Sequence, residues 1–214
     1  SDWSSDVCSS DLAKVKVDAK VGTSVKLTID RDIQWVAQDA ISTAVKKSGA
    51  KSGTVIVMDP KTGAILAQAS APTFDPANKK SITLASIRNP AVQDVYEPGS
   101  TGKVITVAAA LEEKKLTPTT VFTIPYRLKV GTRTYSDHER HATQRLTTTG
   151  LLAVSSNTGA IQVGQSIGKD SLYKYLSAFG VGQNTGSHLP GESAGILHPV
   201  DQWNEASLPT MSFG

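Results

Sequence analysis

The sequence has little of what marks several large classes of protein. Cys8 is the only cysteine among 214 residues, so the chain forms no internal disulfide, which is compatible with an extracytoplasmic protein. No apolar run approaches the roughly 18 residues that span a bilayer. The formal net charge is only +3, and no basic block is interleaved with aromatic residues, which argues against a nucleic-acid partner. What is present, 39% hydrophobic residues without internal repeats, suffices for one globular domain with a core.

Residues 1–12 stand apart from the rest of the chain. They are rich in Ser and Asp and show no apolar periodicity. The stretch resembles translated sequencing-adapter or cloning-derived sequence, and we therefore exclude it from fold reasoning. This exclusion also removes Cys8.

The most informative segment is Ser100-Thr101-Gly102-Lys103, which follows Pro98-Gly99 and opens an apolar helical run. Residues three apart on a helix lie on one face, with Cβ atoms about 5–6 Å apart, so Ser100 Oγ and Lys103 Nζ can meet. A serine becomes a nucleophile when a neighbouring base takes its proton, and a lysine can be that base if burial lowers its pKa. The tetrad is therefore a minimal set of groups for acyl transfer.

Context separates this tetrad from chance matches. The same pattern occurs three more times, at Ser48/Lys51, Ser166/Lys169 and Ser171/Lys174. Only Ser100 follows a Pro-Gly break that places it in the first turn of a helix, where free N–H groups favour negative charge. A phosphate-binding loop is excluded, because that motif needs glycine at position 97 and Ser or Thr at position 104.

A second polar element, Ser155-Ser156-Asn157, lies between two apolar helical runs. Such a turn can aim a hydroxyl and an amide into a cleft. Taken alone, the segment is more often an ordinary helix N-cap, since Ser and Asn are preferred there. The two interpretations are compatible.

Ser-x-x-Lys followed by Ser-x-Asn is the pattern of serine β-lactamases and penicillin-binding proteins. The chain resembles the transpeptidase domain of a class B penicillin-binding protein of the division-associated actinobacterial type. The resemblance covers residues 21–214 and includes the segments 27–34, 53–67, 89–92, 96–100, 179–182 and 189–193. It implies an α+β fold with an antiparallel sheet and a helical subdomain, and a cleft between them with Ser100 at its floor.

The resemblance also implies a mechanism. Lys103 accepts the proton of Ser100, which attacks the carbonyl between the two D-alanines of a peptidoglycan stem peptide. An amine from a neighbouring stem then resolves the acyl-enzyme into a cross-link. Ser155 would relay a proton to the leaving amine, and Asn157 would hydrogen-bond Lys103 and the substrate amide. β-Lactams would acylate Ser100, and no cofactor or metal is implied.

The family further implies an N-terminal membrane anchor and an extracytoplasmic location. It also implies a membrane glycan polymerase and divisome proteins as partners, and no nucleic acid. These implications concern the parent protein, because the anchor and a non-catalytic pedestal would lie upstream.

A third family motif, Lys-Thr-Gly on a late strand, does not follow Ser-x-Asn here. The only Lys-Thr-Gly is Lys61-Thr62-Gly63, where the Asp-Pro-x-x-Gly pattern predicts a hairpin turn. We therefore expect residues 13–214 to be a partial transpeptidase domain that lacks its C-terminal strands. Since such a strand would supply an oxyanion donor and one cleft wall, we expect the 214-residue chain by itself to be nearly inactive.

Two other functions stay open at this point. A serine β-lactamase or β-lactam sensor shares the first two motifs but differs in the fate of the acyl-enzyme. A non-enzymatic scaffold is the other alternative, favoured by the missing motif and disfavoured by the intact Ser100, Lys103, Ser155 and Asn157.

Periodicity predicts the remaining elements. We expect a strand over 21–29, a helix over 31–47 capped by Asp30 or Asp32, a hairpin over 54–69 paired with the first strand, and an irregular or hairpin excursion over 122–135. Further helices are expected over 101–113, 147–154, 158–167 and 171–179. His138 and His141 indicate a surface or cleft-edge loop more than a metal site, because a structural zinc needs four ligands. Glu192 is read as structural.

Overall fold

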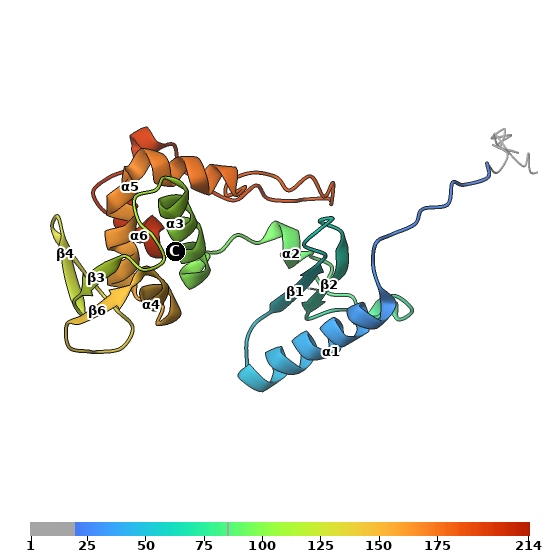
Figure 1. The fold of residues 1–214 in the computed structure, drawn as a ribbon. Coiled ribbons are helices and arrows are strands. Elements are labelled where there is room, and N and C mark those ends of the chain that lie inside the picture. Colours follow the sequence, from blue (N-terminus) through green and yellow to red (C-terminus); the bar gives the residue numbers. More distant parts are fainter. Residues whose placement is uncertain (1–19, 85) are drawn as a thin grey trace, which may run out of the picture.

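The computed structural model describes residues 20–84 and 86–214. The expected adapter-like segment 1–12 lies outside the described residues. Figure 1 shows two parts, one built from α1, β1 and β2 and the other from α3 to α6 with β3 to β6. A segment containing α2 (Pro90–Gln93) joins them, and the loop after α5 returns to it, where Ser193 N donates to Val92 O over 2.7 Å. The expected mixed architecture of helices and antiparallel strands is confirmed.

Helix α1 (Arg31–Ser48) packs on a two-stranded antiparallel sheet. Asp30 caps its start by accepting from Asp32 N and Ile33 N, each over 3.0 Å, and Gly49 ends it in the left-handed conformation, with φ 70°. β1 (Gly53–Met58) pairs with β2 (Ile65–Ala71). The buried cluster between helix and sheet consists of Ala37, Ala67 and Ala69 with Ile33, Ile41, Val55 and Val57 packed around it.

The expected strand over 21–29 is wrong, since these residues form no ladder with the hairpin. The outer edge of β2 is occupied by α1. Gln34 donates its Nε2 to Gln68 O over 3.0 Å and accepts from Gln68 N over 2.8 Å, so its amide takes the place of a neighbouring strand. Towards the N-terminus, Asp30 N donates to Leu66 O over 2.8 Å, and the side chain of Thr28 donates from Oγ1 to Ile65 O over 2.5 Å.

The second part is a cluster of helices around an apolar core. It contains α3 (Gly102–Glu112), α4 (Thr148–Ala153), α5 (Asn157–Ala178) and α6 (Ser207–Phe213). The two helices expected over 158–167 and 171–179 are confirmed as the two halves of α5, which Gly168 separates with a non-helical φ of 79° and ψ of 170°. The core of this part consists of Val107 and Ala110 from α3, Leu151 from α4 and Val163 from α5, together with Leu116 from the segment after α3.

Four short strands flank the helices. β4 (Arg127–Val130) and β5 (Arg133–Ser136) form the hairpin expected within 122–135. β3 (Val121–Ile124) pairs instead with β6 (Gln144–Thr147), a pairing that the sequence patterns did not predict. The described residues also form three 3₁₀ turns, η1 (Lys79–Ser81), η2 (Gly99–Thr101) and η3 (Val200–Gln202).

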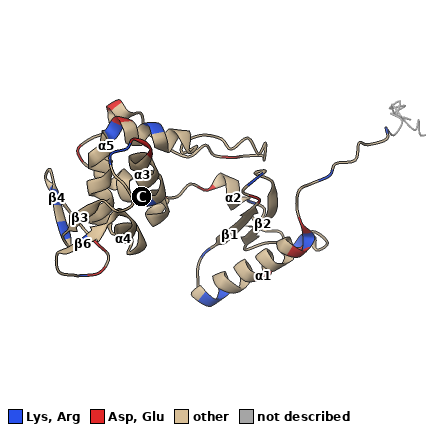
Figure 2. Ribbon diagram, viewed as in Figure 1, with Lys and Arg blue, Asp and Glu red and all other residues tan. Residues whose placement is uncertain are grey.

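The hydrophobicity of the helices and the distribution of charge also bear on function. In the part of the chain that the structure describes, no helix combines the length and apolarity needed to cross a bilayer. Figure 2 shows that basic and acidic residues are distributed over both parts of the molecule.

Candidate active site

Ser100 lies in η2, the one-turn helix that runs directly into α3. Gly99 precedes it with φ 60°, a left-handed conformation that glycine adopts without strain. The turn therefore presents Ser100 at the start of a helix, with its side chain exposed. This agrees with the expected helix start, except that the first turn is 3₁₀.

Lys103 is almost fully buried, with 1% of its surface exposed, and its ammonium group reaches back to Ser100. Nζ donates to Ser100 Oγ over 2.9 Å, to Ser155 Oγ over 2.9 Å and to Ser155 O over 2.7 Å. These three bonds use all three donors of a lysine. Ser155 Oγ donates to Ser100 Oγ over 3.0 Å and closes a triangle of the three side chains.

The environment of Lys103 makes its amine less basic than that of an exposed lysine. Burial lowers the pKa of the amine, and the opposing attraction of the Asp137 carboxylate is smaller, so the pKa stays below the ordinary lysine value. A lysine with a lowered pKa is more readily deprotonated and can accept a proton.

The turn between α4 and α5 positions Ser155. The backbone at Ser155 is left-handed, with φ 56°, which is uncommon outside glycine. Ser156 follows as the N-cap of α5, and its Oγ accepts from Gly159 N over 2.9 Å. The capping interpretation is thus confirmed for Ser156, while its neighbour Ser155 turns towards Lys103.

Asn157 differs from the expectation. Its Nδ2 donates to Ser136 O at the end of β5 over 3.0 Å, and the hydrogen bonds of Lys103 go to the two serines instead. The expected bond between Asn157 and Lys103 is therefore not formed in this structure, since the donors of Lys103 are already used. Asn157 still lines the same cavity as Ser100 and Ser155.

Asp137 is a site residue that the sequence reasoning missed. The residue is 8% exposed, and its carboxylate accepts from Thr158 N, Ser156 Oγ and His141 Nε2 over 2.8, 2.9 and 2.9 Å. Burial alone would raise the pKa of Asp137, but these hydrogen bonds together hold it below its usual value. The only sequence signal was an acidic residue beside two histidines in a predicted loop, which does not reveal its distant partners.

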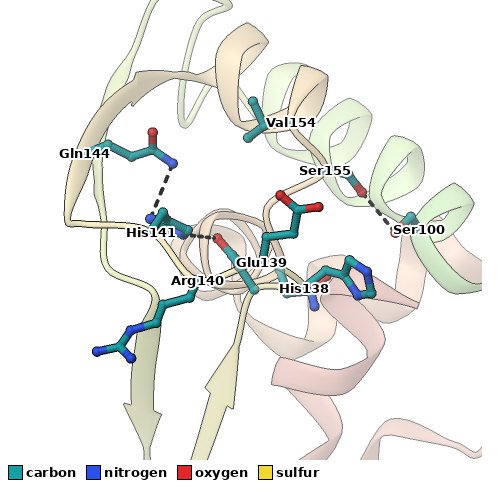
Figure 3. A pocket seen from close by; sticks show the side chains of 10 residues that line it. Ser100, His138, Glu139, Arg140, His141, Gln144, Val154 and Ser155 are labelled. Carbon is teal, nitrogen blue, oxygen red and sulfur yellow. Dashed lines mark hydrogen bonds and ion pairs between the residues drawn. The ribbon is translucent and has the colours of Figure 1, made fainter.

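A cavity of about 690 Å³ opens beside Ser100. Figure 3 shows Ser100 and Ser155 on one side of it and the β5–β6 loop, with Glu139, Arg140 and His141, on the other. The lining residues are Ser100, Asp137, His138, Glu139, Arg140, His141, Gln144, Val154, Ser155 and Asn157. All of them belong to the part built from α3 to α6 and β3 to β6, so the cavity does not lie between these helices and the β1–β2 sheet, where the cleft was expected.

The two histidines lie at the edge of the cavity, as expected. His141 Nδ1 contacts Ala142 O over 2.7 Å and Nε2 contacts Asp137, and because these acceptors favour a doubly protonated ring, the pKa of His141 is raised. Among the described residues, no group of three or more His, Cys, Asp or Glu could hold a metal ion.

The remaining residues singled out in the sequence lie elsewhere. Lys61 belongs to the turn between β1 and β2, as predicted, where Asp59 accepts from Lys61 N over 2.9 Å. Glu192 accepts from Thr185 and Ser187 within its own loop, which confirms a structural role.

Comparison with known proteins now identifies the family. Residues 53–214 match the family described as "Penicillin binding protein transpeptidase domain". Penicillin-binding protein PbpB of Mycolicibacterium smegmatis is 39% identical over 198 residues, which are 92% of this chain and 31% of that protein. A protein of Neisseria flavescens described as "Probable peptidoglycan D,D-transpeptidase PenA" is 37% identical over 196 residues, 91% of this chain and 48% of the relative.

A solved structure gives the same result. Penicillin binding protein 3 of Mycobacterium tuberculosis, in complex with aztreonam, has a TM-score of 0.87 and 37% identity, covering 94% of this chain and 45% of that one. The chain thus spans less than half the length of each of these relatives. The match over residues 53–214 includes both the Ser100–Lys103 turn and the Ser155–Asn157 turn, and the chain belongs to the penicillin-binding protein transpeptidase domain family.

Proposed function

We propose that the protein carrying this chain is a D,D-transpeptidase that cross-links peptidoglycan stem peptides through a serine acyl-enzyme and is acylated by β-lactams. One observation carries the proposal. A buried lysine, Lys103, holds its Nζ 2.9 Å from the hydroxyl oxygens of both Ser100 and Ser155. An activated serine beside a base with a lowered pKa is the arrangement that nucleophilic acyl transfer needs.

In the first half-reaction, the neutral amine of Lys103 takes the proton of Ser100 as Oγ attacks the carbonyl carbon between the two D-alanines. The C–N bond breaks, and D-alanine leaves with a proton delivered through Ser155, whose Oγ lies between Ser100 and Lys103. The Ser100 N–H, in the first turn of the helix, is placed to help hold the oxyanion.

In the second half-reaction, an amine of a neighbouring stem peptide attacks the ester carbonyl. Lys103 and Ser155 accept its proton and return it to Ser100 Oγ as the ester bond breaks. Asn157, which lines the cavity, would hold the substrate amide. Ser100, Lys103, Ser155 and Asn157 are the residues to which we assign the chemistry.

The relatives support this choice over a β-lactamase. One is described as a probable peptidoglycan D,D-transpeptidase, and another was solved with a β-lactam, aztreonam. A β-lactamase also needs a base that activates water, and Glu192 is bonded within its own loop, outside the cavity. A long-lived penicilloyl adduct on the protein would exclude rapid hydrolysis.

The proposed substrate also implies a location. Peptidoglycan is cross-linked outside the cytoplasmic membrane, and we therefore place the parent protein on the extracytoplasmic face of the cell membrane. A membrane glycan polymerase, which makes the strands to be cross-linked, and divisome proteins are the partners we propose. Recovery of the native protein in the soluble cytoplasmic fraction would contradict this location.

The function is tested by labelling the full-length protein with a fluorescent penicillin. We expect a covalent band that Ser100→Ala abolishes. Ser166→Ala is the matched control, because Ser166 belongs to another Ser-x-x-Lys tetrad, on the exposed side of α5, and should label like the wild type. Absence of labelling in the wild type, or equal labelling of Ser100→Ala, would refute the proposal.

A further inference from the structure

We propose that Asp137 is a positioning residue for acylation, which fixes the Ser155–Ser156–Asn157 turn so that both oxygens of Ser155 stay on Lys103. The inference rests on the proposed function and adds to it a residue outside the two sequence motifs. Asp137 follows β5 directly and lies 18 residues before Ser155 in the numbering.

The carboxylate bonds both sides of the turn. Oδ1 accepts from Thr158 N over 2.8 Å, after Asn157, and Oδ2 accepts from Ser156 Oγ over 2.9 Å, before it. Thr158 N–H is one of the free donors at the start of α5, and a buried donor without a partner is costly. The carboxylate thus satisfies the helix start and ties it to the end of β5.

Ser155 depends on these two bonds of Asp137 because its own backbone conformation is unfavourable. Its left-handed backbone, with φ 56°, persists only where the surroundings determine it. Ser156, the next residue, is held by Asp137 through its side chain and by Leu151 O through its N–H, over 2.9 Å. The peptide bond between Ser155 and Ser156 carries the carbonyl that accepts from Lys103 Nζ over 2.7 Å. We therefore expect loss of the bond between Asp137 and Ser156 to loosen this carbonyl.

The end of β5 makes a second, parallel contact. Ser136 O accepts from Asn157 Nδ2 over 3.0 Å, and Asp137 N donates to Tyr126 O over 3.1 Å. Two consecutive residues, Ser136 and Asp137, therefore hold Asn157 and the residues on either side of it. Asp137 is itself held by Tyr126, in the segment that leads into β4.

The charge of Asp137 works against deprotonation of Lys103, because a nearby carboxylate stabilises the ammonium form and raises its pKa. His141, in the loop between β5 and β6, also bonds the Asp137 carboxylate. If Asp137 served only electrostatics, its removal would favour the neutral lysine and speed acylation. A positioning role predicts slower acylation.

The test measures acylation of the full-length protein by a chromogenic cephalosporin in a stopped-flow instrument. It separates the dissociation constant of the initial complex from the acylation rate constant. We expect Asp137→Ala to lower the rate constant by about 10²-fold, because small misplacements of reacting groups have effects of that size. The dissociation constant should change less than the rate constant, since Asn157 is the only proposed substrate contact that belongs to the turn and it keeps its bond to Ser136 O.

Asp137→Asn preserves the shape and keeps an acceptor for Thr158 N–H, so we expect it to rescue part of the lost rate. Asp170→Ala, which removes an exposed carboxylate from α5, is the matched control and should acylate like the wild type. If Asp137→Ala does not fold, Asp137→Asn decides the matter: a lowered rate constant with unchanged binding supports the inference.

Wild-type rate constants in the Asp137 variants, or a loss confined to binding, would overturn the positioning role and leave the proposed function intact. Failure of the wild type to be acylated would overturn both. Faster acylation in Asp137→Asn would show that the charge, and not the position, is what Asp137 contributes.

Discussion

Lys103 and Ser155 are 52 residues apart in the chain, yet Lys103 Nζ donates to both the hydroxyl and the carbonyl oxygen of Ser155, over 2.9 and 2.7 Å. The contact joins the start of α3 to the turn between α4 and α5. It places one amine against two serine hydroxyls, and these in turn bond each other. The proposed chemistry depends on this junction.

Ser155→Ala removes the hydroxyl that bridges Lys103 and Ser100 and leaves the carbonyl contact in place. If Ser155 relays the proton, we expect the acylation rate constant to fall by about 10²–10⁴-fold, the usual range for general acid–base groups. The melting temperature should change little, because Ser155 is exposed. Stopped-flow acylation and thermal denaturation of the same sample measure both effects, and an unchanged rate would remove Ser155 from the mechanism.

Lys103→Met separates activity from stability. The substitution takes away the proposed base, so acylation should fall by about 10²-fold or more. It also replaces a buried amine by an apolar side chain of similar size, while Ser100 and Ser155, the two partners left behind, are exposed and can bond water. We therefore expect a melting temperature equal to or above that of the wild type, and a large decrease would contradict the account of Lys103 burial.

The sequence predicted the local elements well, because each depends on neighbours in the chain. Asp30 and the apolar spacing of residues 31–47 were enough to predict α1, and Asp59 with Gly63 was enough to predict the β1–β2 turn. The three-residue separation of Ser100 and Lys103 in the sequence also predicted their contact.

What the sequence did not predict depends on contacts between distant segments. The edge of β2 is paired by the Gln34 amide and not by a strand over 21–29, because a side-chain amide can replace a strand, which no periodicity reveals. The role of Asp137 depends on Thr158 and Ser156, which reach it only in the folded chain. The bond of Asn157 to Ser136 O, in place of Lys103, has the same origin.

His141 should make folding stability depend on pH. Its contacts with Ala142 O and Asp137 raise its pKa in the folded state above the ordinary value of 6.5. The resulting stabilisation is fully present below the unfolded pKa and is lost as the pH rises through the folded pKa. We therefore expect His141→Ala to lower the melting temperature more at pH 5 than at pH 9. Equal losses at the two pH values would show that the ring stabilises the loop without its charge.

Gly164 lies where α5 packs against α6, and a substitution there tests how closely the two helices pack. A Cβ at this position would lie 1.9 Å from Ser212 Oγ and 2.9 Å from Ser212 Cβ, so α5 and α6 could not keep their distance. Gly164→Ala should destabilise the protein by about 1–3 kcal/mol, as overpacked cores do. Gln165→Ala, on an exposed position of the same helix, is the control. Denaturant titration of both variants measures the difference, and equal stabilities would mean that α6 packs differently.

The central claim is that Lys103 is deprotonated readily enough to activate Ser100, and the pH dependence of the acylation rate constant tests it most directly. In the full-length protein we expect the rate constant to rise with pH through one ionisation whose apparent pKa lies clearly below the ordinary lysine value of 10.5. This limb of the profile should be absent from the residual activity of Lys103→Met. A rate that keeps rising up to pH 10.5, or a profile that Lys103→Met leaves unchanged, would contradict the claim.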